Sequence, residues 1–280
     1  MRQTTRKLVR RTARRVRWAW LHSTARWRTL PEVIIIGAQK SGTTSLFYYL
    51  AQHPQIRSPL RKEIYYFGSN FVKGTDWYRG HFPLKRLLSR GQITFEGSPS
   101  YLFNPIVPAQ IAALLPTVKL IAVLRDPTKR AVSHYFHSKR KGREALSIEE
   151  AMAQEERRLA ELLANSRYDD PAFRHHSYKL RGHYWEQLER FFAIFPRSQL
   201  LVLSSDELFT EPELVLQRVS EFIGIDPTFR FSNLAARNIN PNRQPVEPGV
   251  YEELDRYFRP HNEKLFRMLG QDFGWCRGRS

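Results

Sequence analysis

Near its N-terminus the chain contains the segment Val33-Ile34-Ile35-Ile36-Gly37-Ala38-Gln39-Lys40-Ser41-Gly42-Thr43-Thr44-Ser45-Leu46. Its four consecutive β-branched residues predict a buried parallel strand, and the apolar residues that recur from Leu46 onward predict a helix. Between them lies a turn bounded by two glycines. Such a turn leaves backbone N–H groups and the positive end of the helix dipole facing one point. The segment therefore predicts a site for a phosphate-like anion, to which Lys40 adds a positive charge.

Apolar runs alternate with helical patterns along the rest of the chain. Strands are expected at residues 33–36, 93–96, 120–124 and 200–203, and helices at 44–52, 105–115, 128–139, 148–164, 178–195 and 213–223. This alternation predicts a three-layer α/β fold, in which a central, mostly parallel sheet carries helices on both faces. Ligands of such sheets bind beyond the carboxyl ends of the strands, so the loops after the first three strands should meet at one crevice. Residues 165–177 and 238–248 are expected to be loops.

Composition limits the classes of protein that the chain can belong to. Its 280 residues fit one large domain, and 41% hydrophobic residues suffice for a substantial core. A single cysteine, Cys276, excludes an internal disulfide framework and fits a reducing compartment. The sequence shows neither a transmembrane run nor the pattern of a secretory signal. We therefore expect a cytoplasmic protein.

Residues 1–31 form a basic arm ahead of the domain expected at 32–280. Ten of the first thirty residues are Arg or Lys, no acid precedes Glu32, and the whole chain has a formal net charge of +18. The apolar residues of the arm recur on one helical face: Val9, Ala13, Val16 and Trp20. Two interpretations stay open, a solvated arm or a helix that binds an anionic membrane surface or another polyanion. Nucleic acid is not favoured, because zinc-finger spacing and an RNA-binding sheet signature are both missing.

The glycine spacing of the turn is that of a nucleotide-binding P-loop, which normally continues with Lys and then Ser or Thr. Here Thr43 stands at the lysine position, and the lysine of the loop is Lys40. A kinase or NTPase also needs Mg²⁺, commonly held by an Asp at a strand end. Asp126 lies near the end of the third expected strand, but Arg125 precedes it. A strand-end arginine suits a second anion better than a metal ion.

A second candidate anion site is the segment Leu124-Arg125-Asp126-Pro127-Thr128-Lys129-Arg130-Ala131-Val132-Ser133-His134-Tyr135. Arg125 leaves the strand, Pro127 suits the first turn of a helix, and Ser133 follows about two turns later. Arg125 and Ser133 can share an anion if the helix folds back along the ligand. The alternative is a surface arginine and an ordinary helical serine.

Together the two segments resemble the sulfotransferases that use 3′-phosphoadenosine-5′-phosphosulfate (PAPS), and above all the bacterial and Golgi-type carbohydrate sulfotransferases, including the heparan sulfate group. The resemblance covers residues 32–275. It implies that the loop at 37–44 binds the 5′-phosphosulfate and that Arg125 and Ser133 bind the 3′-phosphate. The residues implied around the 5′-phosphosulfate are Lys40, Ser41, Gly42, Thr43, Thr44 and Ser45.

The segment Arg61-Lys62-Glu63-Ile64-Tyr65-Tyr66-Phe67 is similar to the Lys-Glu-x-x-x-Phe segment of the same family. The resemblance implies that Glu63 is the base that activates the acceptor, because an attacking hydroxyl must lose its proton. An exposed loop carboxylate is the alternative. A sulfuryl group carries one negative charge, so Lys40 and hydroxyl donors can stabilise its transfer without a divalent metal.

Two further positions match the pattern of the family less well. Gly97 stands where heparan-type members often place a lysine, which leaves Lys40 as the main cation at the transferring group. Arg243 corresponds loosely to a contact from the nucleotide lid. The histidines, among them His134, His175 and His183, show no metal-ligand spacing, and we expect no metal.

The sequence thus predicts a PAPS-dependent sulfotransferase that acts on a hydroxyl, or less favourably an amine, of a carbohydrate or glycolipid. Two alternatives stay open. One is a P-loop kinase that acts on a small molecule, and the other is a non-catalytic polyanion-binding protein.

Overall fold

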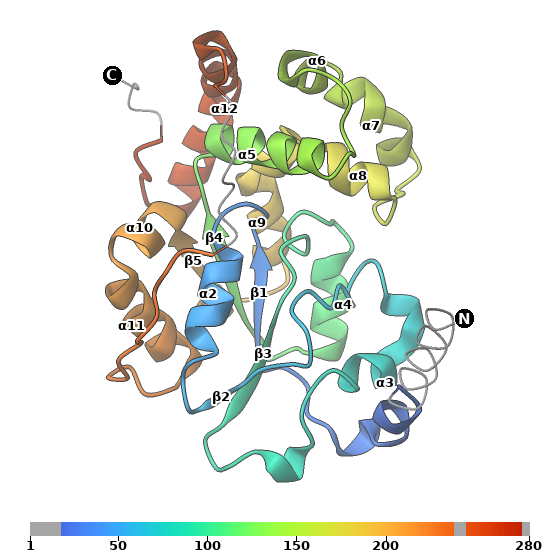
Figure 1. Cartoon of the computed structure of the whole chain (residues 1–280), viewed down its shortest axis with the longest axis vertical. Helices are drawn as coiled ribbons and strands as arrows, with labels where there is room; N and C mark the ends of the chain where they lie inside the picture. The colour runs from blue at the N-terminus through green and yellow to red at the C-terminus, as the bar shows by residue number, and fades with distance from the viewer. Residues whose placement is uncertain (1–17, 238–244, 276–280) are drawn as a thin grey trace, which may run out of the picture.

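The structure is a computed structural model that describes residues 18–237 and 245–275. Its strands are β1 (Val33–Gly37), β2 (Ile56–Arg57), β3 (Ile93–Gly97), β4 (Lys119–Leu124) and β5 (Leu200–Ser204). They form one sheet in the order β2-β3-β1-β4-β5, and every neighbouring pair is parallel (Figure 1). The predicted parallel sheet is confirmed. Of the strands in the described residues, the sequence missed only β2, whose two residues are too few to give a pattern.

Helices follow the strands along the chain. The α-helices are α2 (Thr43–Leu50), α3 (Gly74–Arg79), α4 (Val107–Leu114), α5 (Pro127–Arg140), α6 (Ile148–Ala153), α7 (Glu155–Ala164), α8 (Pro171–His176), α9 (Tyr184–Phe192), α10 (Ser205–Thr210), α11 (Pro212–Ile223) and α12 (Pro248–Leu269). The 3₁₀ turns are η1 (Ala25–Trp27), η2 (Phe71–Lys73), η3 (Lys85–Leu87), η4 (Leu180–Gly182) and η5 (Arg197–Gln199). Helix α12 escaped prediction because charged residues separate its apolar positions and because Pro260, a residue type that usually ends a helix, lies inside it.

The side chains of β1 alternate between two hydrophobic cores, and all are buried. Ile34 and Ile36 belong to the core that α4, α9 and the end of α12 cover. Val33 and Ile35 belong to the core beneath α2, α10 and α11. Each buried aliphatic side chain contributes about 1.5–3 kcal/mol to folding. The two cores make the three layers of the predicted α/β fold, which is confirmed.

Strand β1 lies at the topological switch point of the sheet. The chain places β3 on one side of β1 and β4 on the other, with Val33 in register with both Phe95 and Lys119. Loops that leave the carboxyl ends of β1 and β4 therefore diverge and leave a crevice. Helix α5 crosses the sheet at the carboxyl ends of the strands. Helices α6, α7, α8 and α12 lie beside α5 (Figure 1).

Two predicted helices have different bounds in the structure. The helix expected at 148–164 is interrupted at Gln154 and forms α6 and α7. The helix expected at 178–195 begins only at Tyr184, because η4 precedes it. There Gly182 packs so tightly that an added Cβ would lie 2.5 Å from Phe258. The loop expected at 165–177 contains α8.

The described end of the basic arm, residues 18–31, packs on the domain. Leu21 is buried, and the ring of Trp18 stacks on Trp77 of α3 with their centroids 5.8 Å apart. The buried Arg28 donates from Nη1 to the Phe82 carbonyl at 2.7 Å. Most of the arm's predicted apolar face lies outside the described residues, and the division at residue 31 stays a prediction. Among the described helices, none is long and apolar enough to cross a membrane.

Candidate active site

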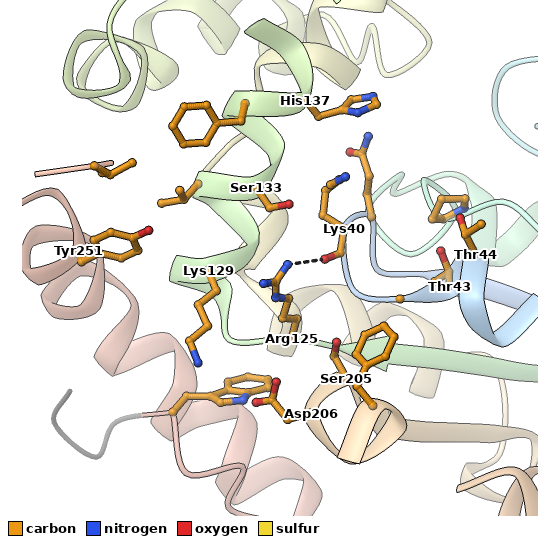
Figure 2. Close-up of a pocket in the computed structure, with 18 of the residues that line it drawn as sticks. Lys40, Thr43, Thr44, Arg125, Lys129, Ser133, His137, Ser205, Asp206 and Tyr251 are labelled. Carbon is orange, nitrogen blue, oxygen red and sulfur yellow. Dashed lines mark hydrogen bonds between the residues drawn. The ribbon is translucent and has the colours of Figure 1, made fainter. Parts of the chain in front are cut away.

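A cleft of about 1500 Å³ opens beyond the carboxyl ends of β1 and β4 (Figure 2). Seven of the residues that the sequence singled out line it: Lys40, Gly42, Thr43, Thr44, Glu63, Arg125 and Ser133. They come from three segments that lie far apart in the chain. The crevice expected after the first three strands therefore exists and contains both candidate anion sites.

The loop between β1 and α2 has a backbone that suits an anion. Gly42 is the N-cap of α2 and has a left-handed φ of 96°, and Lys40 has a φ of 71°. The left-handed φ favours glycine at position 42, and an added Cβ would also crowd the Phe209 ring at 3.0 Å. Because Gly42 has no side chain to cap the helix, the first N–H groups of α2 stay available to a ligand.

Lys40 and Arg125 lie together at the base of the cleft. Arg125 donates from Nη1 to the Lys40 carbonyl at 3.2 Å (Figure 2). Burial, followed by the positive charges of Arg140, Arg125 and Arg130, lowers the pKa of Lys40 to about 8. Several cations are thus held close together, at an electrostatic cost that a bound anion would offset.

Helix α5 folds back along the cleft, which is the condition under which Arg125 and Ser133 can bind the same anion. Asp126 caps the helix by accepting hydrogen bonds from the backbone N–H groups of Thr128 and Lys129. Ser133 and His137, one turn apart, both project toward Lys40 (Figure 2). Arg125 and Ser133 therefore line the same cavity. Burial and the charge of Lys40 lower the pKa of His137 to about 4, which keeps this imidazole neutral.

Two residues that were predicted to bind the donor do not contribute side chains to the cleft. Ser41 and Ser45 are fully buried, and neither lines it. The Ser45 hydroxyl instead accepts a hydrogen bond from the Arg237 backbone N–H at 2.9 Å, which ties the loop before residue 238 to α2. Arg243 lies outside the described residues, so its predicted lid contact stays a prediction.

Glu63 lies in the cleft with both carboxylate oxygens engaged. Lys62 Nζ lies 3.1 Å from Oε1, and the Tyr65 hydroxyl donates to Oε2. Glu63 and Tyr65 both have left-handed backbones, with φ of 62° and 53°. Burial and the neighbouring carboxylate raise the pKa of Tyr65, so its hydroxyl keeps the proton that it donates. About a third of the Glu63 side chain stays exposed, which leaves it accessible to an acceptor.

Sequence reasoning missed a set of cations that line the same cleft. Lys141, Arg143 and Arg174, here called the basic wall, come from the loop after α5 and from α8. No local pattern marks them, because only the packing of α5 against α8 brings them together. Another part of the lining comes from α10 and α12 and includes Asp206 and Tyr251 (Figure 2).

Comparison with known proteins defines the class to which this fold and site belong. The family described as "Sulfotransferase domain" matches residues 30–246, which is well over half of the chain. The chain belongs to the sulfotransferase family.

Individual relatives agree with this assignment. The chain is 32% identical to heparan sulfate glucosamine 3-O-sulfotransferase 3B1 of Mus musculus, over 89% of this chain and 65% of that protein. It is 29% identical to the membrane-associated sulfotransferase kil1 of Dictyostelium discoideum, over 88% of this chain and 66% of that protein. The chain thus spans just under two thirds of the length of these relatives.

A solved structure gives the same result for the fold. The sulfotransferase from Alicyclobacillus acidocaldarius is 29% identical and superposes with a TM-score of 0.73, covering 89% of this chain and 100% of that one. The sulfotransferase domain of the Synechococcus PCC 7002 olefin synthase, at 15% identity and a TM-score of 0.50, shares the fold alone.

Proposed function

We propose that this chain transfers a sulfuryl group from PAPS to a hydroxyl of a carbohydrate or glycolipid acceptor. The observation that carries the proposal is the meeting of two anion sites and one carboxylate in a single cleft. The N-terminus of α2 with Lys40 supports a 5′-phosphosulfate, and Arg125 with Ser133 supports a 3′-phosphate. A mononucleotide with phosphates at both positions fits this pair better than a nucleoside triphosphate does.

The acceptor side supports a negatively charged saccharide. The basic wall lines the same cleft as Glu63, so an acceptor that reaches Glu63 can also contact its cations. Arginine and lysine favour carboxylate and sulfate groups, which charged saccharides carry. The name of the 3-O-sulfotransferase relative, which specifies a heparan sulfate glucosamine, is consistent with such an acceptor.

The chemistry follows from the roles of two side chains. The acceptor oxygen attacks sulfur while Glu63 accepts its proton, and the bond from sulfur to the phosphate oxygen breaks. Lys40 stabilises the negative charge that develops on the departing phosphate oxygen. Lys62 and Tyr65 hold the carboxylate in place, so little orientation is lost when the acceptor binds. Charge neutralisation by side chains and N–H groups is expected to suffice without a divalent metal.

Thermal unfolding with two ligands separates this proposal from a kinase. Adenosine 3′,5′-bisphosphate without metal should raise the melting temperature more than ATP with Mg²⁺ does. The Arg125→Ala variant should bind the bisphosphate roughly 10- to 100-fold more weakly, because a charge-assisted contact is lost. The exposed Arg86, which does not line the cleft, provides a matched control as Arg86→Ala. A larger response to ATP with Mg²⁺ would contradict the proposal.

A further inference from the structure

A second cluster of reactive side chains lies where α9 meets α12, outside the cleft. His183 is the N-cap residue of α9, Glu186 lies one turn later, and His261 is on α12. One ligand atom from each of the three lies within 4.8 Å of the other two. None of the three lines the cleft, and the proposed transfer reaction uses none of them.

We propose that His183, Glu186 and His261 bind one divalent transition metal ion of the zinc class, which links the start of α9 to α12. Two imidazoles and one carboxylate are a ligand set that Zn²⁺ accepts, with a fourth position left for water. This site could not be predicted from the sequence, because His261 lies on α12, a helix that the sequence pattern did not predict.

The separation of two of the ligand atoms fits a metal better than a hydrogen bond. His183 Nδ1 lies 3.6 Å from Glu186 Oε1, which is longer than a good hydrogen bond. Two tetrahedral ligands at usual zinc distances lie about 3.4 Å apart. A small shift would therefore place both atoms at bonding distance from one ion.

The other nitrogen of His183 already has the partner that a metal-bound histidine needs. His183 Nε2 lies 2.9 Å from the Tyr257 hydroxyl. Histidine ligands usually donate this second N–H to a fixed acceptor, which sets the tautomer and the direction of the ring. With Nε2 donating to Tyr257, the lone pair of Nδ1 faces outward for a metal.

His261 must turn to complete the site. Its ring is stacked on that of His183, with centroids 3.7 Å apart and an angle of 11° between the planes. Parallel rings do not aim their lone pairs at one point, so His261 has to tilt about its soft second side-chain torsion. The side chain is only partly buried, and its Nδ1 accepts a long bond of 3.4 Å from Trp185, which a metal can displace.

Two cations near the cluster limit how tightly it can hold a metal ion. The ammonium groups of Lys179 and Lys264, over the rings of Tyr257 and Trp185, oppose the added charge, so we expect moderate affinity.

The site has a structural consequence for the cleft. Helix α12 supplies Tyr251, Arg256 and Arg259 to the lining, and His261 is on the same helix. A metal ion at His261 would hold this helix against α9. The metal would thus steady one wall of the cleft without touching the reacting groups.

Cobalt provides the direct test, because four-coordinate Co²⁺ has visible absorption that hexaaqua Co²⁺ lacks. Chelator-treated full-length protein titrated with CoCl₂ should develop this absorption, saturate at one equivalent and lose it when ZnCl₂ is added. The His261→Gln and Glu186→Gln variants should lose the saturable signal. Both side chains are partly exposed, so these variants should fold, whereas the buried His183 is a riskier target.

The exposed His22 provides the matched control, and His22→Gln should bind Co²⁺ as the parent does. ZnCl₂ should raise the melting temperature of the parent and of His22→Gln but not that of His261→Gln. Absence of a one-equivalent signal, or an unchanged signal in His261→Gln, would overturn the proposal. All variants should still bind adenosine 3′,5′-bisphosphate, measured in the same samples. A failure of the metal-site proposal can therefore be told apart from a failure of the proposed transferase function.

Discussion

The two sides of the cleft are built in different ways. The part of the donor side proposed for the 5′-phosphosulfate, from β1 through Lys40 to α2, is one continuous segment anchored in both hydrophobic cores, and the segment from the end of β4 into α5 adds Arg125 and Ser133. The acceptor side is assembled from the Glu63 segment, the loop after α5, α8 and α12. A continuous segment can specify an anion site by itself, whereas an assembled surface depends on how distant elements pack. The donor site can therefore stay the same in proteins whose acceptors differ.

The largest effect on turnover should come from replacing Glu63. This change should impair the acceptor side of the cleft and leave the donor side intact. Replacing Glu63 with Gln removes the base but keeps the size of the side chain, so kcat should fall by about 10²–10⁴. Bisphosphate affinity should stay unchanged, because the carboxylate belongs to the acceptor side. Steady-state transfer rates and calorimetric titration measure the two quantities. Turnover that survives in Glu63→Gln would remove Glu63 from its proposed role.

Replacing Lys40 should affect both the rate of transfer and the affinity for the donor nucleotide. In Lys40→Ala, transfer should slow by about 10²–10³, because the charge on the departing oxygen is no longer stabilised. Bisphosphate binding should weaken as well, since the same ammonium faces the 5′ end of the ligand. Single-turnover kinetics at saturating donor isolate the chemical step. A variant that lost binding alone would limit Lys40 to holding the donor.

The pH dependence of donor binding should reveal the same lysine. The pKa of Lys40 is about 8, below its usual value, so its charged form is present below pH 8 and is lost above it. Bisphosphate affinity should therefore decline as the pH rises past 8. The Lys40→Arg variant keeps its charge over this range, and its affinity should decline less. Equal slopes for the two proteins would assign the titration to another group.

The smallest effect should come from Tyr65, which supports Glu63 through one hydrogen bond. Tyr65→Phe should lower kcat roughly 2- to 10-fold and leave donor affinity unchanged. Tyr168→Phe is the control, because Tyr168 does not line the cleft. If donor affinity fell together with kcat, Tyr65 would be part of the general packing and not a positioning residue for the carboxylate.

The same contrast explains what could be predicted from the sequence. The parallel sheet and the anion loop follow from patterns in short, contiguous segments, whereas the position of Ser133 in the cleft depends on how α5 folds back over the sheet. The basic wall and the part of the lining that α12 contributes could not be predicted, because Arg143, Arg174 and Tyr251 meet only through tertiary packing. The buried position of Ser45 also depends on tertiary structure, since its partner is the backbone of Arg237. Its role in donor binding stays a prediction, as does that of Arg243.

The most direct measurement is transfer of a labelled sulfuryl group from PAPS to a panel of saccharides and glycolipids, in the absence of divalent metal. The account predicts label in at least one charged saccharide with the parent protein, and almost none with Glu63→Gln. The proposed transfer would be contradicted if the protein bound adenosine 3′,5′-bisphosphate but the label stayed with the nucleotide for every acceptor. That result would leave a protein that binds the donor nucleotide without using it.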